Sequence, residues 1–366
     1  MIKRIGILTS GGDCAGLNAV IQAVTYRANK GYGWEVFGIK QGTSGLLERP
    51  ISYRKLTPAD FQGGDMLRLG GTILGTTNKG NPFEYPMPDG TVIDRTEEVI
   101  EGYRMLGLDA LIGVGGDGSL ELLNKITQKG KINFVGIPKT IDNDLGATEY
   151  SIGFNTAVQV ATEALDRLQP TAASHDRVMI LEVMGRDAGH IALNAGIAGG
   201  ADIILIPEIP YSFESIAAKI EELKKAGRNF ALIVVAEAVK TQSGEPIKIA
   251  DTKGKTRYGG ISHYLADCVS EMTGAETRFM VLGHVQRGGQ PVATDRILAS
   301  SFGVKAVDLI AQGAFGRLVI WQNRQVLDVP LKQAVAGYQA VDLNSALVQT
   351  AKGLGIYIGD AAPLYA

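Results

Sequence analysis

The order of apolar and amphipathic segments is the feature of this sequence that most constrains its fold. Short apolar runs of strand length lie at residues 5–10, 35–39, 110–115, 132–137, 177–182, 202–205, 230–236, 277–282 and 318–321. Segments of helical character follow most of them, at residues 15–28, 120–127, 156–168, 188–197, 213–226, 263–272 and 293–311. Such alternation is typical of βαβ units, which build mainly parallel sheets covered by helices. The 366 residues suffice for two α/β domains.

The composition excludes several classes of protein. Hydrophobic residues make up 45% of the chain, and its 47 glycines follow no G-X-Y period, so a globular protein with many tight turns is expected. A net charge of -2 gives no electrostatic reason to bind nucleic acid or an anionic membrane. No apolar run reaches the roughly 20 residues of a membrane-spanning helix. The first residues lack the pattern of a signal peptide, and Cys14 and Cys268 are too few for a disulfide framework. We therefore expect a cytoplasmic protein with two unpaired thiols.

Polar motifs follow the apolar runs at the points where the predicted strands end. In parallel α/β sheets, ligands bind outside the carboxyl ends of the strands. The motifs there are SGGD (10–13), GGDGS (115–119), PKTIDND (138–144), EVMGRDAGH (182–190), EA at Glu237 and GHVQRGG (283–289). Two other polar stretches, 78–90 and 241–258, are predicted to be exposed loops.

The first two motifs have the composition of phosphate-binding loops. SGGD precedes a helix, where free N–H groups and small glycines suit a phosphate group; the alternative is a tight turn in which Asp13 caps the helix. GGDGS carries Asp117 between glycines, and this carboxylate could share a Mg²⁺ ion with substrate phosphates. Its alternative is a bare turn with Ser119 as the helix cap.

The third motif combines two aspartates with a lysine and a threonine. One carboxylate could remove the proton of a hydroxyl group during phosphoryl transfer, while the other helps to hold a metal ion. Lys139 and Thr140 could bind the transferring phosphoryl group. The alternative is an acidic turn in contact with solvent.

Basic residues flank the predicted strands and could receive a phosphorylated substrate. Arg177, Arg186, Arg278 and Arg287 have the planar donor geometry that suits phosphate oxygens, and His284 lies near the last of them. Structural salt bridges, or a core histidine in the case of His284, are the alternatives.

Taken together and in this order, SGGD, GGDGS, PKTIDND, SHDR, EVMGR and GHVQRGG resemble the phosphofructokinase family. The resemblance covers residues 5 to about 323. It implies a phosphate-donor site with Mg²⁺ as cofactor and Asp117 as the metal-binding residue. The donor-binding residues that it implies are Gly12, Gly116, Asp117, Gly118, Ser119 and Lys139.

The resemblance also implies roles around the acceptor, fructose 6-phosphate. Asp142 would be the base that deprotonates the 1-hydroxyl group, Asp144 would assist through the metal ion, and Thr140 would contact the transferring phosphoryl group. The sugar would be held by Met184, Gly185, Arg186 and Glu237, of which Arg186 is also implied to be catalytic.

A shared sugar site implies an oligomer. Arg177 and Arg278 would reach the sugar-phosphate site of a neighbouring subunit, where His284 and Arg287 complete the pocket. The resemblance thus favours a homo-oligomer, a tetramer rather than a dimer.

Members of the family use either ATP or pyrophosphate, and two positions bear on the donor. Gly118 leaves room for the nucleotide, where an aspartate would repel its α-phosphate, whereas Lys139 is typical of pyrophosphate enzymes. ATP is favoured because Lys139 can serve either donor. In the loop after GGTILG, Asn78 replaces an arginine, so Lys139 or Lys79 could supply the missing charge.

Further departures concern adenine binding and regulation. Thr43 and Leu122 replace an aromatic residue and a glycine near the expected adenine site. At positions where arginines bind effectors in bacterial members, this chain has Gln22, Tyr26 and Gln169. Little response to ADP or phosphoenolpyruvate is therefore predicted at that site.

We thus expect two α/β domains: a donor domain of residues 1–153 and 287–336, and a sugar-phosphate domain of residues 154–286 and 337–366. The expected reaction is the phosphorylation of fructose 6-phosphate by MgATP, with fructose 1,6-bisphosphate and ADP as products. The alternatives are the same transfer from pyrophosphate and a catalytically silent sugar-phosphate-binding subunit. A dinucleotide-dependent oxidoreductase is disfavoured because SGGDCAG lacks the G-x-G-x-x-G spacing.

Overall fold

The computed structural model describes residues 2–250 and 256–360. Contacts between residues divide the chain into two compact units. Unit 1 comprises Met1–Ile141, Leu145–Thr156 and Arg287–Tyr338, and unit 2 comprises Asp142–Asp144, Ala157–Gln286 and Gln339–Ala366. Residues 361–366 of the predicted sugar-phosphate domain, and residues 251–255 of the predicted loop at 241–258, lie outside the described residues.

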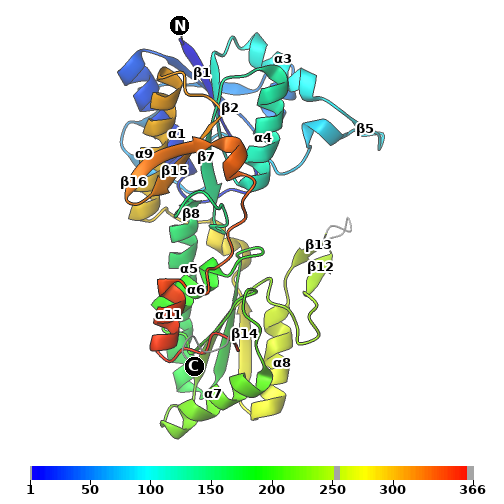
Figure 1. Cartoon of the computed structure of the whole chain (residues 1–366), viewed down its shortest axis with the longest axis vertical. Coiled ribbons are helices and arrows are strands. Elements are labelled where there is room, and N and C mark those ends of the chain that lie inside the picture. The colour runs from blue at the N-terminus through cyan, green and yellow to red at the C-terminus, as the bar shows by residue number, and fades with distance from the viewer. Residues whose placement is uncertain (1, 251–255, 361–366) are drawn as a thin grey trace. The chain divides into compact units, whose positions relative to one another are not determined.

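Unit 1 is built on an eight-stranded, mainly parallel sheet (Figure 1). Its strands follow the order β16-β15-β7-β6-β1-β2-β3, and β8 pairs with the end of β7. Their bounds are β1 (Arg4–Thr9), β2 (Glu35–Ile39), β3 (Tyr53–Leu56), β6 (Ala110–Gly115), β7 (Phe134–Thr140), β8 (Ile152–Gly153), β15 (Arg317–Gln322) and β16 (Gln325–Pro330). All pairs are parallel except those of the two edge strands, β3 with β2 and β16 with β15.

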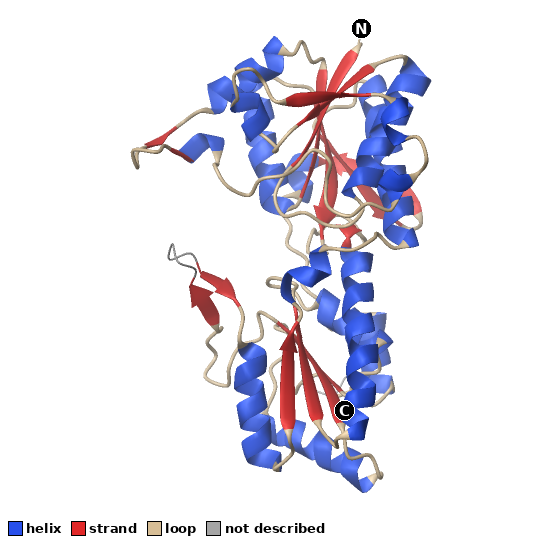
Figure 2. Cartoon of the chain, turned by 180° about the vertical axis from the view of Figure 1, so that it is seen from behind, coloured by secondary structure: helices blue, strands red, loops and turns tan. Residues whose placement is uncertain are grey.

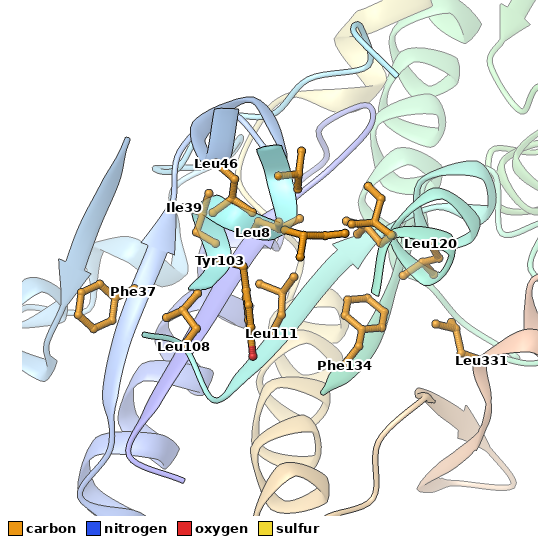
Figure 3. Packing of buried hydrophobic residues seen from close by; sticks show 14 of the residues in the cluster. Leu8, Phe37, Ile39, Leu46, Tyr103, Leu108, Leu111, Leu120, Phe134 and Leu331 are labelled. Carbon is orange, nitrogen blue, oxygen red and sulfur yellow. The ribbon is translucent and has the colours of Figure 1, made fainter. Parts of the chain in front are cut away.

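Helices cover both faces of this sheet (Figure 1). On one face, α1 (Leu17–Tyr26) and its π-helical extension η1 (Arg27–Gly31) pack against α9 (Ala293–Ala311). The other face carries α2 (Ser44–Leu47), α3 (Thr96–Met105), α4 (Asp117–Gly130) and α10 (Leu331–Ala334). Figure 3 shows the core on this second face, where Leu8, Leu111 and Phe134 from the strands meet Tyr103 and Leu120 from the helices. Each such buried side chain contributes about 1.5 to 3 kcal/mol to the free energy of unfolding.

Unit 2 contains a four-stranded, fully parallel sheet with helices on both faces (Figure 2). Its strand order is β10-β11-β9-β14, with bounds β9 (Val178–Val183), β10 (Ile203–Leu205), β11 (Ala231–Ala236) and β14 (Thr277–Val281). The helices are α5 (Phe154–Ser174), α6 (His190–Ala198), α7 (Phe213–Lys225), α8 (Ile261–Thr273) and α11 (Ala346–Gly353). The α/β class with mainly parallel sheets is thus confirmed.

Short hairpins and turns complete the fold. Antiparallel strand pairs occur at the two stretches predicted to be exposed loops. In the first, β4 (Tyr85–Pro86) pairs with β5 (Val92–Ile93), which lies just beyond the stretch; in the second, β12 (Lys248–Ala250) pairs with β13 (Thr256–Tyr258). Single helical turns are η2 (Pro58–Phe61), η3 (Asp65–Leu67), η4 (Pro82–Glu84) and η5 (Gly283–Arg287). Cys14 and Cys268 are both unpaired, as predicted. Among the described residues, none of the helices is both long and apolar enough to cross a membrane.

Candidate active site

The SGGD loop follows β1 and is packed closely by other loops of unit 1. Gly11 has a φ of +83°, and a Cβ atom there would come within 2.6 Å of the Ser119 hydroxyl oxygen. A Cβ atom at Gly12 would come within 2.8 Å of the Arg287 guanidinium. The left-handed φ and the close Ser119 hydroxyl oxygen therefore favour glycine at position 11, whereas a Cβ atom at position 12 would require only the end of the flexible Arg287 side chain to shift. The alternative role of Asp13 as a helix cap is wrong, because α1 begins at Leu17 and has no side-chain cap.

The GGDGS loop leads directly into the amino end of α4. Asp117 is the first residue of that helix and is half-buried, while Gly116 occupies the cap position without a side-chain hydrogen bond. The alternative in which Ser119 caps the helix is therefore wrong. Gly118 is exposed, and no atom lies within 4 Å of the position that a Cβ atom would take there. The free N–H groups of this helix end suit a phosphate group.

Two basic side chains reach the SGGD loop. The buried Lys139 at the end of β7 donates a hydrogen bond from its ammonium group to the carbonyl oxygen of Gly12. Arg287 donates from Nη1 to the carbonyl oxygen of Asp13 over 3.2 Å. Both cations thus lie beside the loop with the phosphate-binding composition, a favourable environment for an anion. Arg287, which the resemblance implied for the sugar pocket, belongs to unit 1 by its contacts.

The acidic segment after β7 is buried rather than exposed. Asp142, Asn143 and Asp144 expose only 7%, 7% and 4% of their surface, so the alternative of a solvated acidic turn is wrong. Asn143 lies between the two carboxylates with a left-handed φ of 54°, a conformation that asparagine tolerates better than most residues. The carbonyl oxygen of Asp144 accepts a 2.8 Å hydrogen bond from the Gln339 amide. The segment therefore holds two acids in a fixed turn of low accessibility.

Several implied sugar-binding residues gather at the carboxyl ends of the strands of unit 2. The Glu237 carboxylate after β11 accepts a 2.9 Å hydrogen bond from the backbone N–H of Arg186, which follows β9. Arg186 has a φ of 54°, an uncommon conformation that often occurs at functional sites. Burial raises the pKa of Glu237 to about 7, and the negative charge of Asp142 adds to the effect. Met184, Gly185, Arg186 and Glu237 are thus brought together.

Two residues of this region were not predicted. The buried Gln286 accepts a 2.7 Å hydrogen bond through its side-chain oxygen from the Met184 amide. The buried Glu182 accepts hydrogen bonds of 3.0 and 2.6 Å from the amide and hydroxyl groups of Ser262 at the start of α8. The only indication in the sequence was their position, because Glu182 lies in the motif EVMGRDAGH and Gln286 lies in GHVQRGG.

Arg177 and Arg278 lie at the other end of the sheet of unit 2. Arg177 precedes β9 and Arg278 is the second residue of β14, so both lie at the amino ends of their strands. Both pair with Glu276, at 2.9 and 2.6 Å. Arg177 lies six residues before the end of β9 and Arg278 three residues before the end of β14, which separates them from the carboxyl ends by roughly 20 and 10 Å. Within one chain, therefore, neither Arg177 nor Arg278 lies beside Glu237. His284 is exposed in η5.

A divalent metal ion would depend on substrate phosphates for most of its ligands. The part of the chain that the structure describes contains no group of three or more His, Cys, Asp or Glu side chains able to hold a metal ion. The half-buried Asp117 at the phosphate-type loop fits a Mg²⁺ ion that keeps waters and phosphate oxygens as its other ligands.

The positions that depart from the family pattern have mixed environments. Thr43 is buried, Leu122 is half-buried, and Asn78 and Lys79 are exposed. Gln22 and Tyr26 line an open hollow of about 510 Å³ between α1 and α9. The hollow also contains Arg27, whose guanidinium is held 2.7 Å from Asp308. Gln169 is exposed. The weak effector response stays a prediction.

Comparisons with known proteins agree with the motifs. The family model described as Phosphofructokinase matches residues 4–310. The chain is 62% identical to "ATP-dependent 6-phosphofructokinase 1" of Synechocystis sp., over 98% of this chain and 99% of that protein. It is 61% identical to the protein of the same name from Nostoc sp., over the same shares.

Two solved structures that resemble this chain are also phosphofructokinases. Phosphofructokinase from Pichia pastoris in the T-state superposes with a TM-score of 0.78 and 32% identity, over 92% of this chain and 36% of the longer Pichia chain. A pyrophosphate-dependent phosphofructokinase from Marinobacter aquaeolei has a TM-score of 0.78 over 99% of this chain and 94% of its own, and at 22% identity it supports the fold alone. The family model and the full-length relatives together establish that this chain belongs to the phosphofructokinase family.

Proposed function

We propose that the protein transfers the γ-phosphoryl group of ATP to the 1-hydroxyl group of fructose 6-phosphate, giving fructose 1,6-bisphosphate and ADP. The observation that carries the proposal is the buried pair Asp142 and Asp144, directly after a strand that ends in Lys139 and Thr140. Relatives along 98% of the chain bear the name ATP-dependent 6-phosphofructokinase. The reaction is a step of glycolysis, which accords with a cytoplasmic location.

Asp142 is the proposed general base. Its carboxylate removes the proton of the 1-hydroxyl group as the oxygen attacks the γ-phosphorus atom, and Thr140 contacts the transferring group. Asp144, in the same turn, would help to hold a bound metal ion through its waters. Lys139 and Arg186 stabilise the negative charge that spreads over the phosphoryl oxygens.

Donor binding is assigned to unit 1. The N–H groups of Gly12, Gly116, Gly118 and Ser119 bind the phosphates at the two loop motifs, and Lys139 lies beside them. Asp117 and the phosphates of ATP would hold Mg²⁺, which would supply positive charge to the donor phosphates. We assign residues 1–153 and 287–336 to this donor domain, and residues 154–286 and 337–366 to the sugar-phosphate domain.

Pyrophosphate is the second candidate for the donor, since Lys139 is typical of enzymes that use it. ATP is preferred because Gly118 is exposed and has no neighbour within 4 Å of its missing side chain. A nucleotide α-phosphate can approach such a position, whereas an aspartate there would repel it.

Sugar binding uses residues of this chain and of a second copy. Met184, Gly185, Arg186 and Glu237 hold the sugar, with His284 and Arg287 on its phosphate. Arg177 and Arg278 lie away from the carboxyl ends of their strands, so we assign them to the sugar site of a neighbouring subunit.

The edge strand β14 supports this assembly. Its residues Phe279, Met280 and Val281 expose 44%, 47% and 50% of their surface, and the nearby Val285 exposes 64%. Contiguous exposed apolar side chains on an edge strand mark a contact surface. A homo-oligomer is therefore proposed, a tetramer rather than a dimer.

Purified protein assayed with fructose 6-phosphate and Mg²⁺, in parallel with ATP and with pyrophosphate, tests the function. Product with pyrophosphate alone would overturn the choice of donor. Turnover with neither donor, despite binding of the sugar phosphate, would favour the silent regulatory subunit.

The base is tested by Asp142→Ser. We expect turnover to fall on the order of 10²-fold or more, with affinity for fructose 6-phosphate largely kept. Turnover close to that of the unmodified protein would remove Asp142 from the mechanism.

A further inference from the structure

A tyrosine of the hairpin β12–β13 is hydrogen-bonded to the loop that carries Arg186. Tyr258, the last residue of β13, donates from its hydroxyl group to Oδ1 of Asp187 over 2.6 Å. Asp187 raises the pKa of Tyr258 to about 12. The phenol therefore stays protonated, and remains a donor, throughout the neutral range.

Asp187 in turn faces the guanidinium of its neighbour. Its second oxygen, Oδ2, lies 3.9 Å from Nε of Arg186, at the long limit of an ion pair. The backbone of Arg186 is fixed by its hydrogen bond to Glu237, but its side chain is long and exposed. The position of the Asp187 carboxylate therefore bears on the direction of this guanidinium.

Hydrogen bonds just after Tyr258 attach the hairpin to the sheet. Two residues later, the amide of Gly260 donates to Glu182 over 3.3 Å, and Ser262 donates to the same carboxylate through two groups. Glu182 is buried at the end of β9. On the other side, the ammonium of Lys248 lies 5.5 Å from the centre of the Tyr258 ring. These contacts hold Tyr258 beside the loop of Arg186.

We propose that Tyr258 and Asp187 form a positioning pair that directs the Arg186 guanidinium toward the bound acceptor sugar. This inference rests on the proposed function of the site. Tyr258 occupies one oxygen of Asp187 and keeps the carboxylate from closing on Arg186 as a bidentate ion pair. Such a pair would neutralise the guanidinium and compete with an anionic substrate. The hairpin thereby contributes to recognition of the sugar phosphate.

The pair predicts a selective effect on the acceptor. Tyr258→Phe should raise KM for fructose 6-phosphate about fivefold, because Asp187 becomes free to engage Arg186. KM for ATP should change by less than about twofold. Asp187→Asn should also raise KM for the sugar, because the neutral amide no longer orients the guanidinium. In the double variant the effect of Tyr258→Phe should disappear, since the phenol acts only through Asp187.

Steady-state kinetics of the full chain, with calorimetric titration of fructose 6-phosphate in the absence of donor, provide the test. Tyr211→Phe is the matched control, because its hydroxyl also donates within unit 2, to the Lys240 carbonyl oxygen at 3.0 Å. This control should leave both KM values unchanged. Urea unfolding of each variant checks that it folds. If Asp187→Asn does not fold, the selective effect of Tyr258→Phe alone tests the proposal.

An unchanged sugar KM in Tyr258→Phe would overturn the pairing, as would equal rises of both KM values or fully additive effects in the double variant. Activity of the unmodified protein tests the proposed function separately. A protein that phosphorylates the sugar but shows no selective effect refutes only the positioning pair.

Discussion

At the scale of single residues, burial sets the environment of the acidic side chains at the candidate site. Asp142 and Asp144 were candidates from their place after an apolar run, but nothing in the sequence indicated that both are buried. Gln286 was not predicted because its partner, the Met184 amide, is about a hundred positions away and is met only in the folded chain. The roles of these residues stay predictions, to be tested by substitution.

The pKa of Glu237 leads to a prediction about stability. Burial raises this pKa from 4.5 to about 7, so the folded state holds the proton more tightly than the unfolded state. The contribution of Glu237 to the free energy of unfolding is therefore full below pH about 4.5 and decreases as the pH rises to about 7. Glu237→Gln remains neutral and avoids this loss. Relative to the unmodified protein, the variant should gain about 3 kcal/mol between pH 4.5 and pH 8.

Urea unfolding at several pH values measures this difference. Glu271→Gln, at an exposed position of α8, controls for the removal of one charge. A stability difference for Glu237→Gln that is independent of pH would contradict the burial of an ionisable carboxyl group at this position.

At the scale of elements, burial decided which strands could be predicted. The central strands β1, β6 and β7 are buried on both faces, so they are nearly continuous apolar runs in the sequence. The edge strand β3 exposes Tyr53, Arg54 and Lys55, and β16 is also largely accessible. Neither forms an apolar run. Both were missed because a strand at an edge is held by its hydrogen bonds to one neighbour rather than by burial.

The start of α9 provides a prediction at this scale. Asp295, in its first turn, is fully buried and accepts hydrogen bonds from the amide of Thr156 at 2.8 Å and from its hydroxyl group at 2.5 Å. Both of these hydrogen bonds go to Oδ2, and Asn155 donates to Oδ1 over 3.3 Å, so the amide nitrogen in Asp295→Asn would face a donor in either orientation. We expect the free energy of unfolding to fall by about 2 to 4 kcal/mol.

Asp308→Asn on the same helix is the control. Asp308 pairs with Arg27 at a partly exposed position, so its loss should cost less than about 1 kcal/mol. Both variants are compared by urea denaturation. Equal effects of the two substitutions would mean that the Asp295 network does not stabilise this end of the helix.

At the scale of the whole molecule, the sequence pattern predicted the α/β class but not the exposed apolar edge of the sheet of unit 2. Arg177 and Arg278 were candidates for phosphate binding, and only the strand register reveals that they lie at the amino ends of β9 and β14. A single sequence carries no signal for the exposed edge of β14, because the side chains of β14 resemble those of a core strand. This resemblance is itself consistent with a strand that becomes covered in an assembly.

The assembly is tested by Met280→Asp on β14. Met280 exposes 47% of its surface, and a carboxylate there would have to lose its hydration in an apolar contact between subunits. Light scattering should detect a smaller particle for this variant at micromolar protein concentration. KM for fructose 6-phosphate should rise about tenfold, because Arg278, two residues away on the same strand, would no longer reach a neighbouring site. Met105→Asp on α3, where the methionine exposes 60%, is the matched control and should change neither property. An unchanged particle mass with normal sugar affinity would exclude β14 as the contact surface and return Arg278 to a role within its own chain.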